Sequence, residues 1–225
     1  MKVKHIFTDI DGTLVVYPEN VEFSRSPMAL LEDLVMEKHG IPRNEANIKI
    51  KSCGNTAIQC LSEFLEELEI PGESYFKSLC SALENNLQIP DDTVRFLEFL
   101  KVNNFEVYTA TTNSPFVTWA KLAVAGLASV EGTTYFTGYF PGCSFKDPRG
   151  KNDPEYYDKI LQAGCFAPEY SMMIGDIPEK DAIPALKAGM RYGVNIDRRQ
   201  ADPIIEKDGI LRINSFDHLI PLLEK

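Results

Sequence analysis

The sequence predicts an α/β protein: a doubly wound parallel sheet with a helical segment inserted after the first strand. Short apolar strands alternate with amphipathic helices through the second half of the chain, which is typical of such a sheet. Between about residues 24 and 88, helical periodicity continues with no strand pattern. We therefore expect an α/β core formed by residues 1–16 and 89–225, and a helical-bundle domain formed by residues 17–88.

The first core element is a buried strand at residues 3–8 (VKHIFT), which the turn sequence DIDGT follows directly. Three stretches of the insert carry apolar residues at helical spacing, with Gly or Pro between them. They are residues 28–40, 55–70 and 73–87.

Strands and helices alternate after the insert. A helix starts at Pro90-Asp91-Asp92 and leads into a strand. The expected strands are residues 105–110, about 135–140, 171–176 and 192–196, and the helices between them are residues 115–127, 154–164 and 182–189. This order predicts a parallel sheet with helices on both faces.

Composition limits the classes of function. The 225 residues are 44% hydrophobic and 25% charged, as in a globular protein with a sizeable core. The net charge is −10, from 23 basic and 33 acidic residues, which disfavours nucleic acid or an anionic membrane as a partner. The N-terminus turns acidic before an apolar signal region forms, and no apolar run reaches membrane-spanning length. We expect a cytoplasmic monomer or weak homodimer.

The cysteine pattern argues against a zinc site. The five cysteines are odd in number and at least seven positions apart, and the chain has three histidines in no ligand cluster. They are Cys53, Cys60, Cys80, Cys143 and Cys165. This usage is typical of free, buried thiols in a reducing compartment.

Polar side chains follow three of the predicted strands. Asp9 and Asp11 follow the first strand, Thr111 follows the second, and Asp176 follows a later one, while Lys151 lies in a loop before a helix. Alone, each has a structural explanation as a turn residue, a helix cap or a solvated lysine. Because parallel strands present their carboxyl ends at one edge of the sheet, we expect these groups to converge on one crevice.

The motif order resembles a known family. Strand-DxDGT, strand-Thr, Lys-x-x-Pro and strand-GD-x4-D run from Asp9 to Asp181 and resemble the four-motif signature of the haloacid dehalogenase (HAD) superfamily. The resemblance implies a Rossmann-like core. The helical insert is similar to the α-helical (C1) cap of one subclass, which closes over the active site.

The resemblance also implies roles. Asp9 would be the nucleophile that forms an aspartyl-phosphate, and Asp11 the general acid and base. Thr111 would bind a phosphoryl oxygen, and Lys151 would neutralise charge in the transition state. Asp9, Asp176 and the backbone carbonyl of Asp11 would bind Mg²⁺, a cation that prefers oxygen ligands.

The carboxylate at position 11 distinguishes members of the superfamily. Haloacid dehalogenases have an aromatic residue there, and phosphonate-cleaving members have alanine, whereas this chain has Asp11. The resemblance thus implies a phosphatase that acts on a small phosphorylated metabolite. A phosphomutase of the sugar-phosphate type and a non-catalytic phosphate-binding protein are the alternatives.

Several assignments stay open at this point. Spacing favours Thr111 over Thr112 by one position, although Thr112 is also a candidate for substrate binding. Lys151 is favoured over Lys146, but the family's proline directly after the lysine is missing from KNDP. Asp181 would orient the waters around the metal.

The insert offers candidates for substrate contact. A break between two helical stretches contains Gly54 and Asn55, which we expect to face the active site. An N-cap role for Asn55 is the competing interpretation. Tyr17 and Glu19 follow the first motif and are candidates for gating access.

Overall fold

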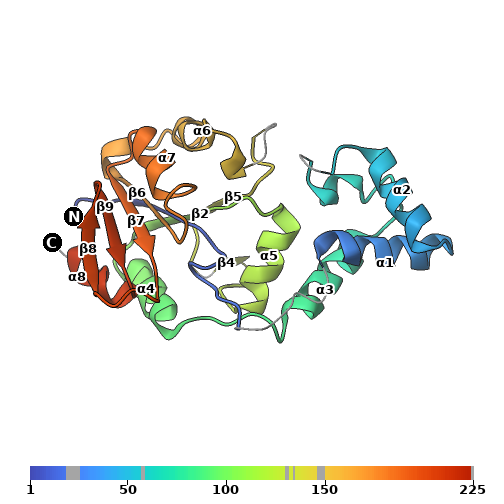
Figure 1. The fold of residues 1–225 in the computed structure, drawn as a ribbon, viewed down its shortest axis with the longest axis horizontal. Helices are drawn as coiled ribbons and strands as arrows, with labels where there is room; N and C mark the ends of the chain where they lie inside the picture. Colours follow the sequence, from blue (N-terminus) through green and yellow to red (C-terminus); the bar gives the residue numbers. More distant parts are fainter. Residues whose placement is uncertain (19–25, 57–58, 130–131, 134, 146–149, 224–225) are drawn as a thin grey trace.

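A seven-stranded sheet forms the centre of the larger lobe in the computed structural model (Figure 1), which describes residues 1–18, 26–56, 59–129, 132–133, 135–145 and 150–223. Its strands are β1 (His5–Thr8), β2 (Glu106–Ala110), β5 (Gly138–Phe140), β6 (Ser171–Gly175), β7 (Tyr192–Ile196), β8 (Ile204–Lys207) and β9 (Ile210–Ile213). The order is β5-β2-β1-β6-β7-β9-β8, and every neighbouring pair is parallel except β8 with β9. The short strands β3 (Ala128–Ser129) and β4 (Gly132–Thr133) pair separately. The predicted α/β class is confirmed.

Helices cover both faces of this sheet. They are α4 (Asp91–Val102), α5 (Pro115–Val124), α6 (Tyr156–Ala163), α7 (Ala182–Lys187) and α8 (Ile220–Leu223). Side chains alternate between the faces of a strand. Ile6 of β1 accordingly packs in one core cluster with α4, α5 and α8, while Phe7 packs in another with α6 and α7.

The helical lobe consists of α1 (Pro27–His39), α2 (Arg43–Cys53), a 3₁₀ helix η1 (Leu61–Phe64) and α3 (Gly72–Leu83). These elements share an apolar cluster that includes Leu31, Ile50 and Tyr75. The same cluster contains Val117 and Ala120 of α5, so this helix belongs to the cores of both lobes. None of the described helices has both the length and the apolar character that a membrane span requires.

Two chain segments connect the lobes, and they pair where the boundary was predicted. Val16 and Gln88 exchange two backbone hydrogen bonds of 2.9 Å. The predicted boundaries at residues 16 and 89 lie at this bridge. The division into two domains stays a prediction, because α5 packs on both sides.

Three local predictions differ from the structure. Among the described residues of the helix expected at residues 55–70, η1 alone is helical, and turns follow it while Phe64, Leu65 and Leu68 are buried in the apolar cluster of the helical lobe. Helix α2 was not predicted, because its buried side chains are limited to Ala46 and Ile50. The hairpin β8–β9 was also missed, because its strands carry charged residues and lie at an edge of the sheet.

The prediction of free thiols is wrong for two cysteines. Cys60 and Cys143, which are 83 positions apart in the sequence, form a disulfide with their Cα atoms 6.3 Å apart. Cys53, Cys80 and Cys165 are free. Only the tertiary structure brings the first two together, so the spacing of cysteines along the chain does not reveal the pair.

Candidate active site

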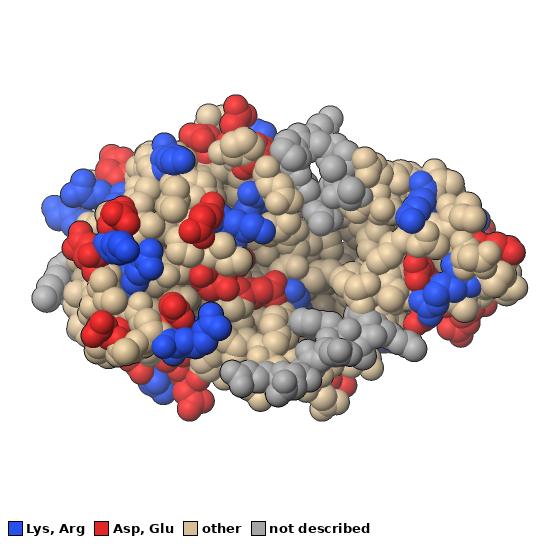
Figure 2. Space-filling view, in the orientation of Figure 1, with Lys and Arg blue, Asp and Glu red and all other residues tan. Residues whose placement is uncertain are grey.

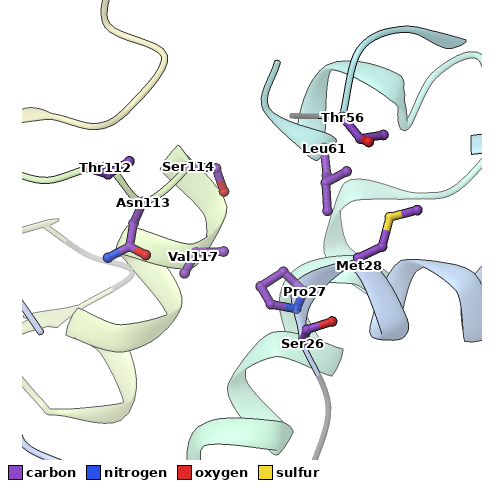
Figure 3. A pocket seen from close by; sticks show the side chains of 9 residues that line it. All are labelled: Ser26, Pro27, Met28, Thr56, Leu61, Thr112, Asn113, Ser114 and Val117. Atoms are coloured by element: carbon purple, nitrogen blue, oxygen red, sulfur yellow. The ribbon is translucent and has the colours of Figure 1, made fainter. Parts of the chain in front are cut away.

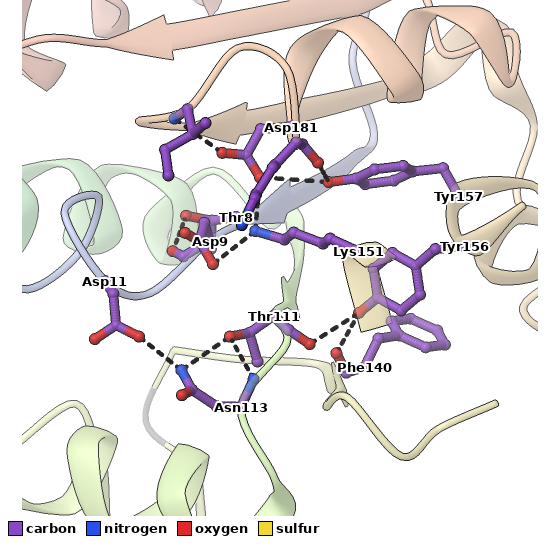
Figure 4. Close-up of polar contacts among 12 residues, drawn as sticks. Thr8, Asp9, Asp11, Thr111, Asn113, Phe140, Lys151, Tyr156, Tyr157 and Asp181 are labelled. Atoms are coloured by element: carbon purple, nitrogen blue, oxygen red, sulfur yellow. Dashed lines mark hydrogen bonds and ion pairs between the residues drawn. The ribbon is translucent and has the colours of Figure 1, made fainter. Parts of the chain in front are cut away.

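The predicted groups meet at the carboxyl edge of three neighbouring strands. In β1, Thr8 pairs with Thr109 of β2 on one side and with Ile174 of β6 on the other. The loops that follow β1, β2 and β6 therefore begin side by side at the same edge of the sheet. Figure 4 shows Asp9, Asp11 and Thr111 around one space, with Lys151 entering from the opposite side.

The turn after β1 requires a residue without a side chain. Gly12 has φ +75°, and a Cβ at this position would lie 2.2 Å from Oδ2 of Asp176. The Gly12 amide donates to the carbonyl of Val15 (2.8 Å), which closes the turn. This glycine thus lets the loop that carries Asp9 and Asp11 pass directly against the loop after β6.

Lys151 is the central cation of the site. Its ammonium nitrogen lies 2.7 Å from Oδ1 of Asp9 and 2.6 Å from Oδ1 of Asp181. The Lys151 side chain is 4% exposed and that of Asp181 is 1% exposed, so water screens this triad poorly. The Ile177 amide donates to the second oxygen of Asp181 (3.1 Å), which holds that carboxylate in place.

Polar contacts hold the backbone around Lys151, where Asn152 stands in place of the proline expected after the lysine. The Asp153 amide donates to the carbonyl of Gly150, and the Asp153 carboxylate accepts from the amide of Glu155 and pairs with Lys159. These bonds fix the short 3₁₀ helix η2 (Gly150–Asn152) that presents Lys151. The rival candidate Lys146 lies outside the described residues, as does Glu19.

The surroundings of Asp9 and Asp11 shift the pKa values of the two carboxyl groups in opposite directions. Burial raises the pKa of Asp9 to about 7, because Lys151 only partly offsets the loss of water and Asp181 adds a like charge. Burial acts to raise the pKa of Asp11 too, but Lys121, Tyr17 and Asn113 outweigh it, and the pKa of Asp11 is lowered.

Asp11 is held by three side chains, of which Lys121 was missed in the sequence. The Lys121 ammonium lies 2.7 Å from both carboxylate oxygens of Asp11. The Asn113 amide donates to Oδ2 (2.7 Å), and the Tyr17 hydroxyl donates to Oδ1. A lysine within the otherwise apolar helix PFVTWAKLAV was the available signal, and a search limited to strand ends does not find it.

Thr111 is the better placed of the two threonines. Its side chain is buried, and its hydroxyl accepts from the backbone amide (3.2 Å) and the side-chain amide (3.0 Å) of Asn113. Thr111 and Thr112 both line a cavity of about 140 Å³. Its other lining residues are Asp9, Asp11, Asn113, Lys151, Ile177, Lys180 and Asp181.

The acidic groups at this edge suit a hard divalent cation. One carboxylate oxygen from each of Asp9, Asp176 and Asp181 lies within 4.8 Å of the other two. Oδ1 of Asp176 is buried and has no hydrogen-bond partner among the described residues. Asn195 donates to the backbone carbonyl of Asp176 (2.8 Å) and fixes the loop. An all-oxygen set with one unpartnered carboxylate oxygen is the donor chemistry that Mg²⁺ prefers.

A second, larger cavity of about 440 Å³ lies between the lobes. Its lining residues, shown in Figure 3, are Ser26, Pro27, Met28, Thr56, Leu61, Thr112, Asn113, Ser114 and Val117. The space-filling view shows this side of the molecule hollowed between the lobes (Figure 2). A neighbouring cavity of about 350 Å³ shares four of these residues and reaches Lys121.

The predicted contact residues of the insert, Gly54 and Asn55, are not among the residues that line the cavity between the lobes. Thr56 and Leu61 supply the lining from the segment that follows α2, among the residues described. The Asn55 amide donates to the side chain of Gln59 (2.7 Å), and a Cβ on Gly54 would meet the same side chain. Substrate binding by Gly54 and Asn55 stays a prediction.

Known structures share this fold. A HAD phosphatase from Thermococcus onnurineus matches with a TM-score of 0.59 at 20% identity, covering 98% of each chain. The structure of YfnB from Bacillus subtilis, which is bound to magnesium, matches with a TM-score of 0.59 at 18% identity and covers 100% of each chain. A Thermotoga maritima protein provisionally described as a beta-phosphoglucomutase gives 0.58 at 18% identity, covering 99% of each.

Sequence comparison adds the family. An enolase-phosphatase E1 from Persephonella marina is 28% identical over 132 residues, which cover 59% of this chain and 55% of that protein. The chain thus matches about half the length of this curated relative. The family model described as haloacid dehalogenase-like hydrolase matches residues 3–189, more than four fifths of the chain. The chain belongs to the haloacid dehalogenase-like hydrolases, a family of enzymes.

Proposed function

We propose that the protein is a Mg²⁺-dependent phosphatase that hydrolyses a small phosphorylated metabolite through an aspartyl-phosphate on Asp9. The observation that carries the proposal is the position of Lys151, within 2.7 Å of Asp9 at the wall of a cavity that Thr111 also lines. A nucleophile, a cation and a hydroxyl donor around one small space are the groups that phosphoryl transfer needs.

The two half-reactions use the same residues. A carboxylate oxygen of Asp9 attacks phosphorus, the bond to the ester oxygen breaks, and Asp11 gives that oxygen a proton. Water then attacks phosphorus and gives a proton to Asp11, and the bond between phosphorus and Asp9 breaks. Thr111 donates to a phosphoryl oxygen throughout. The phosphoenzyme divides one difficult displacement into two.

Charge is the main obstacle to the first step. Two unit negative charges 4 Å apart repel by about 4 kcal/mol at an effective dielectric constant near 20. Lys151 opposes this repulsion from a position between Asp9 and Asp181. Asp9, Asp176 and the backbone carbonyl of Asp11 would hold Mg²⁺, with Asp181 orienting its waters. When bound, the cation neutralises charge on the phosphoryl oxygens.

The helical lobe acts as a cap in this proposal. Residues 17–88 would close over the site and exclude water, and the cavity between the lobes would take the leaving group. Its lining includes Met28, Leu61 and Val117 beside Asn113 and Ser114, so it offers apolar and polar surface together. Such a mixed surface fits a small organic leaving group. We place the enzyme in the cytoplasm as a monomer or weak homodimer.

The direct test is hydrolysis of p-nitrophenyl phosphate with and without Mg²⁺. Asp9→Asn should abolish turnover, because an amide is not a nucleophile toward phosphorus. Asp158→Asn, an exposed acid on α6, is the matched control and should leave the rate unchanged. A mass increase of one phosphoryl group after rapid acid quench, absent in Asp9→Asn, would report the covalent intermediate. Full activity in Asp9→Asn would refute the mechanism.

A phosphomutase is the second candidate. The fold resembles that of the Thermotoga maritima protein, which supports this second candidate. A mutase would pass the phosphoryl group from the same aspartate to a sugar. Analysis of the products from a sugar phosphate, with a bisphosphate activator present, separates the two. Inorganic phosphate indicates the phosphatase, and an isomeric sugar phosphate indicates the mutase.

A further inference from the structure

The disulfide joins the two lobes of the molecule. Cys60 lies directly before η1 in the helical lobe and is completely buried. Cys143 lies in the core, on the loop between β5 and η2, and is partly exposed. Because the two cysteines are 83 positions apart in the sequence, the bond closes a large covalent ring of residues 60–143, which includes the linker at Gln88.

Chain neighbours of the two cysteines adjoin the cavity between the lobes. Leu61, the residue after Cys60, lines that cavity from the helical lobe. On the core side, the amide of Gly142, the residue before Cys143, donates to the carbonyl of Asn113 (2.6 Å), and Asn113 lines both this cavity and the one around Asp9. The disulfide therefore joins two segments that lie next to the two sides of the cavity.

A separate, non-covalent contact holds the lobes together through α3 and α5. The ring of Phe116 lies 6.0 Å from that of Tyr75 and 6.3 Å from that of Phe76. Val117 and Ala120 continue this apolar contact. Besides the two backbone connections, the described residues of the oxidised chain thus join the lobes through the disulfide and through this apolar contact, and reduction breaks the disulfide.

We propose that Cys60 and Cys143 form a redox latch that controls how freely the helical lobe opens. The inference rests on the proposed function, in which substrate and product exchange between the lobes. When the disulfide is intact, the lobe is tied to the loop that leads to Lys151, and exchange is slow. When it is reduced, the lobe moves about its α3–α5 contact, and exchange is fast.

The reductant is a dithiol. Its thiolate attacks the sulfur of Cys143, the more exposed of the pair, and Cys60 leaves as a thiolate that takes up a proton. The second thiol of the reductant then attacks the mixed disulfide and releases Cys143. In total the protein gains two electrons and two protons, and the dithiol becomes a disulfide. A reversible disulfide of this kind is the form expected in a reducing compartment.

The test compares the protein purified without reductant and after treatment with dithiothreitol. Alkylation and peptide mass analysis should find Cys60 and Cys143 paired before treatment and free afterwards. Amide hydrogen exchange in residues 61–68 should be at least about 10-fold faster in the reduced protein, because the lobe opens more often. Turnover of p-nitrophenyl phosphate should rise at least about 3-fold on reduction.

Variants separate the latch from other effects of reductant. Cys143→Ser and Cys143→Ala should exchange and turn over like the reduced protein under both conditions. Cys165→Ser removes an exposed free thiol and should respond to reductant like the wild type. Exchange in residues 61–68 that does not change on reduction would overturn the latch, and so would free Cys60 and Cys143 thiols in the untreated protein. An inactive enzyme whose exchange still responds would contradict the proposed phosphatase and leave the latch supported.

Discussion

Lys121 binds both carboxylate oxygens of Asp11 at 2.7 Å, and it does so from the helix that packs against the helical lobe. Its side chain is 10% exposed, so the pair lies largely out of water. On the same helix, Val117 and Ala120 contact α3 and its neighbours. Helix α5 therefore connects the proposed proton donor to the surface on which the helical lobe rests.

Replacing Lys121 with Met should slow the reaction and change its pH dependence. Without the ammonium group, the effect of burial on Asp11 loses its main opponent, so the pKa of Asp11 rises. Asp11 gives a proton in one half-reaction and accepts one in the next, so the pH optimum should move upward. Because the ion pair no longer holds the Asp11 carboxylate in position, kcat at the optimum should fall about 10-fold or more. Steady-state kinetics between pH 5 and 9 measure both effects.

A conservative substitution and a remote one control this experiment. Lys121→Arg keeps the charge and should keep the pH optimum, even if the longer side chain lowers kcat. Lys77→Met removes an exposed lysine that pairs with Glu73 on α3 and should change neither quantity. An unshifted optimum in Lys121→Met would show that the ion pair has no influence on proton transfer.

The sequence predicted the positions of the reacting groups because the backbone dictates them. Asp9, Thr111 and Asp176 each follow a buried parallel strand, and adjacent strands bring their ends together whatever the rest of the chain does. Lys151 is predicted from the Lys-x-x-Pro motif, and its ammonium nitrogen lies 2.7 Å from Oδ1 of Asp9. The locations of Asp9, Thr111 and Asp176 could be predicted because the pattern of strands determines them.

Contacts that depend on tertiary packing could not be predicted from the order of strands in the sequence. Lys121 reaches Asp11 across 110 positions, and Cys60 pairs with Cys143 across 83. A lysine in an apolar helix marks Lys121 as unusual, but local spacing does not indicate the partner of Lys121 or of Cys60. The apolar spacing of the segment around η1 predicts a helix, whereas its turns depend on what Phe64 packs against.

The two adjacent threonines should differ in their importance. Thr111→Val removes a buried hydroxyl that accepts two bonds from Asn113 and that would donate to the phosphoryl group. We expect kcat/KM to fall about 10-fold or more, the effect of losing one donor to a developing charge. Thr112→Val is the same change on the neighbouring, less buried side chain, and it should lower kcat/KM by less than about 3-fold. The reverse ranking would make Thr112 the residue that binds phosphate.

A buried carboxylate in α4 should be important for stability. Asp92 accepts from the amide of Phe216 (2.8 Å) and the hydroxyl of Ser215 (2.9 Å), and it pairs with Arg198 (3.1 Å). Asp92→Ala leaves the Arg198 guanidinium without its anion and the buried Phe216 amide without its acceptor, so we expect a loss of about 3 kcal/mol in the free energy of unfolding. Urea denaturation measures it. Asp91→Ala, on the exposed side of the same turn, should cost less than about 1 kcal/mol.

Magnesium should stabilise the protein more at high pH than at low pH. The pKa of Asp9 is raised from 3.8 to about 7, so between these values the folded metal-free protein binds a proton that the unfolded chain has lost. Its free energy of unfolding should therefore fall as the pH rises through this window. A cation that binds the carboxylate competes with that proton, so Mg²⁺ should raise the melting temperature by about 3 °C or more at pH 8 and by less than half as much at pH 5.5.

Thermal unfolding with 10 mM Mg²⁺ (about the excess that a weak oxygen-ligand site needs) or with a chelator measures this difference. In Asp9→Asn the metal-free protein should lose most of its pH dependence between pH 5.5 and 8, because the amide does not titrate, and it should respond weakly to Mg²⁺ at both values. Asp158→Asn should behave like the wild type. Equal stabilisation of the wild type by Mg²⁺ at both pH values would mean that the cation binds without displacing a proton from Asp9, and the site would then have to be sought at Asp176 and Asp181 alone.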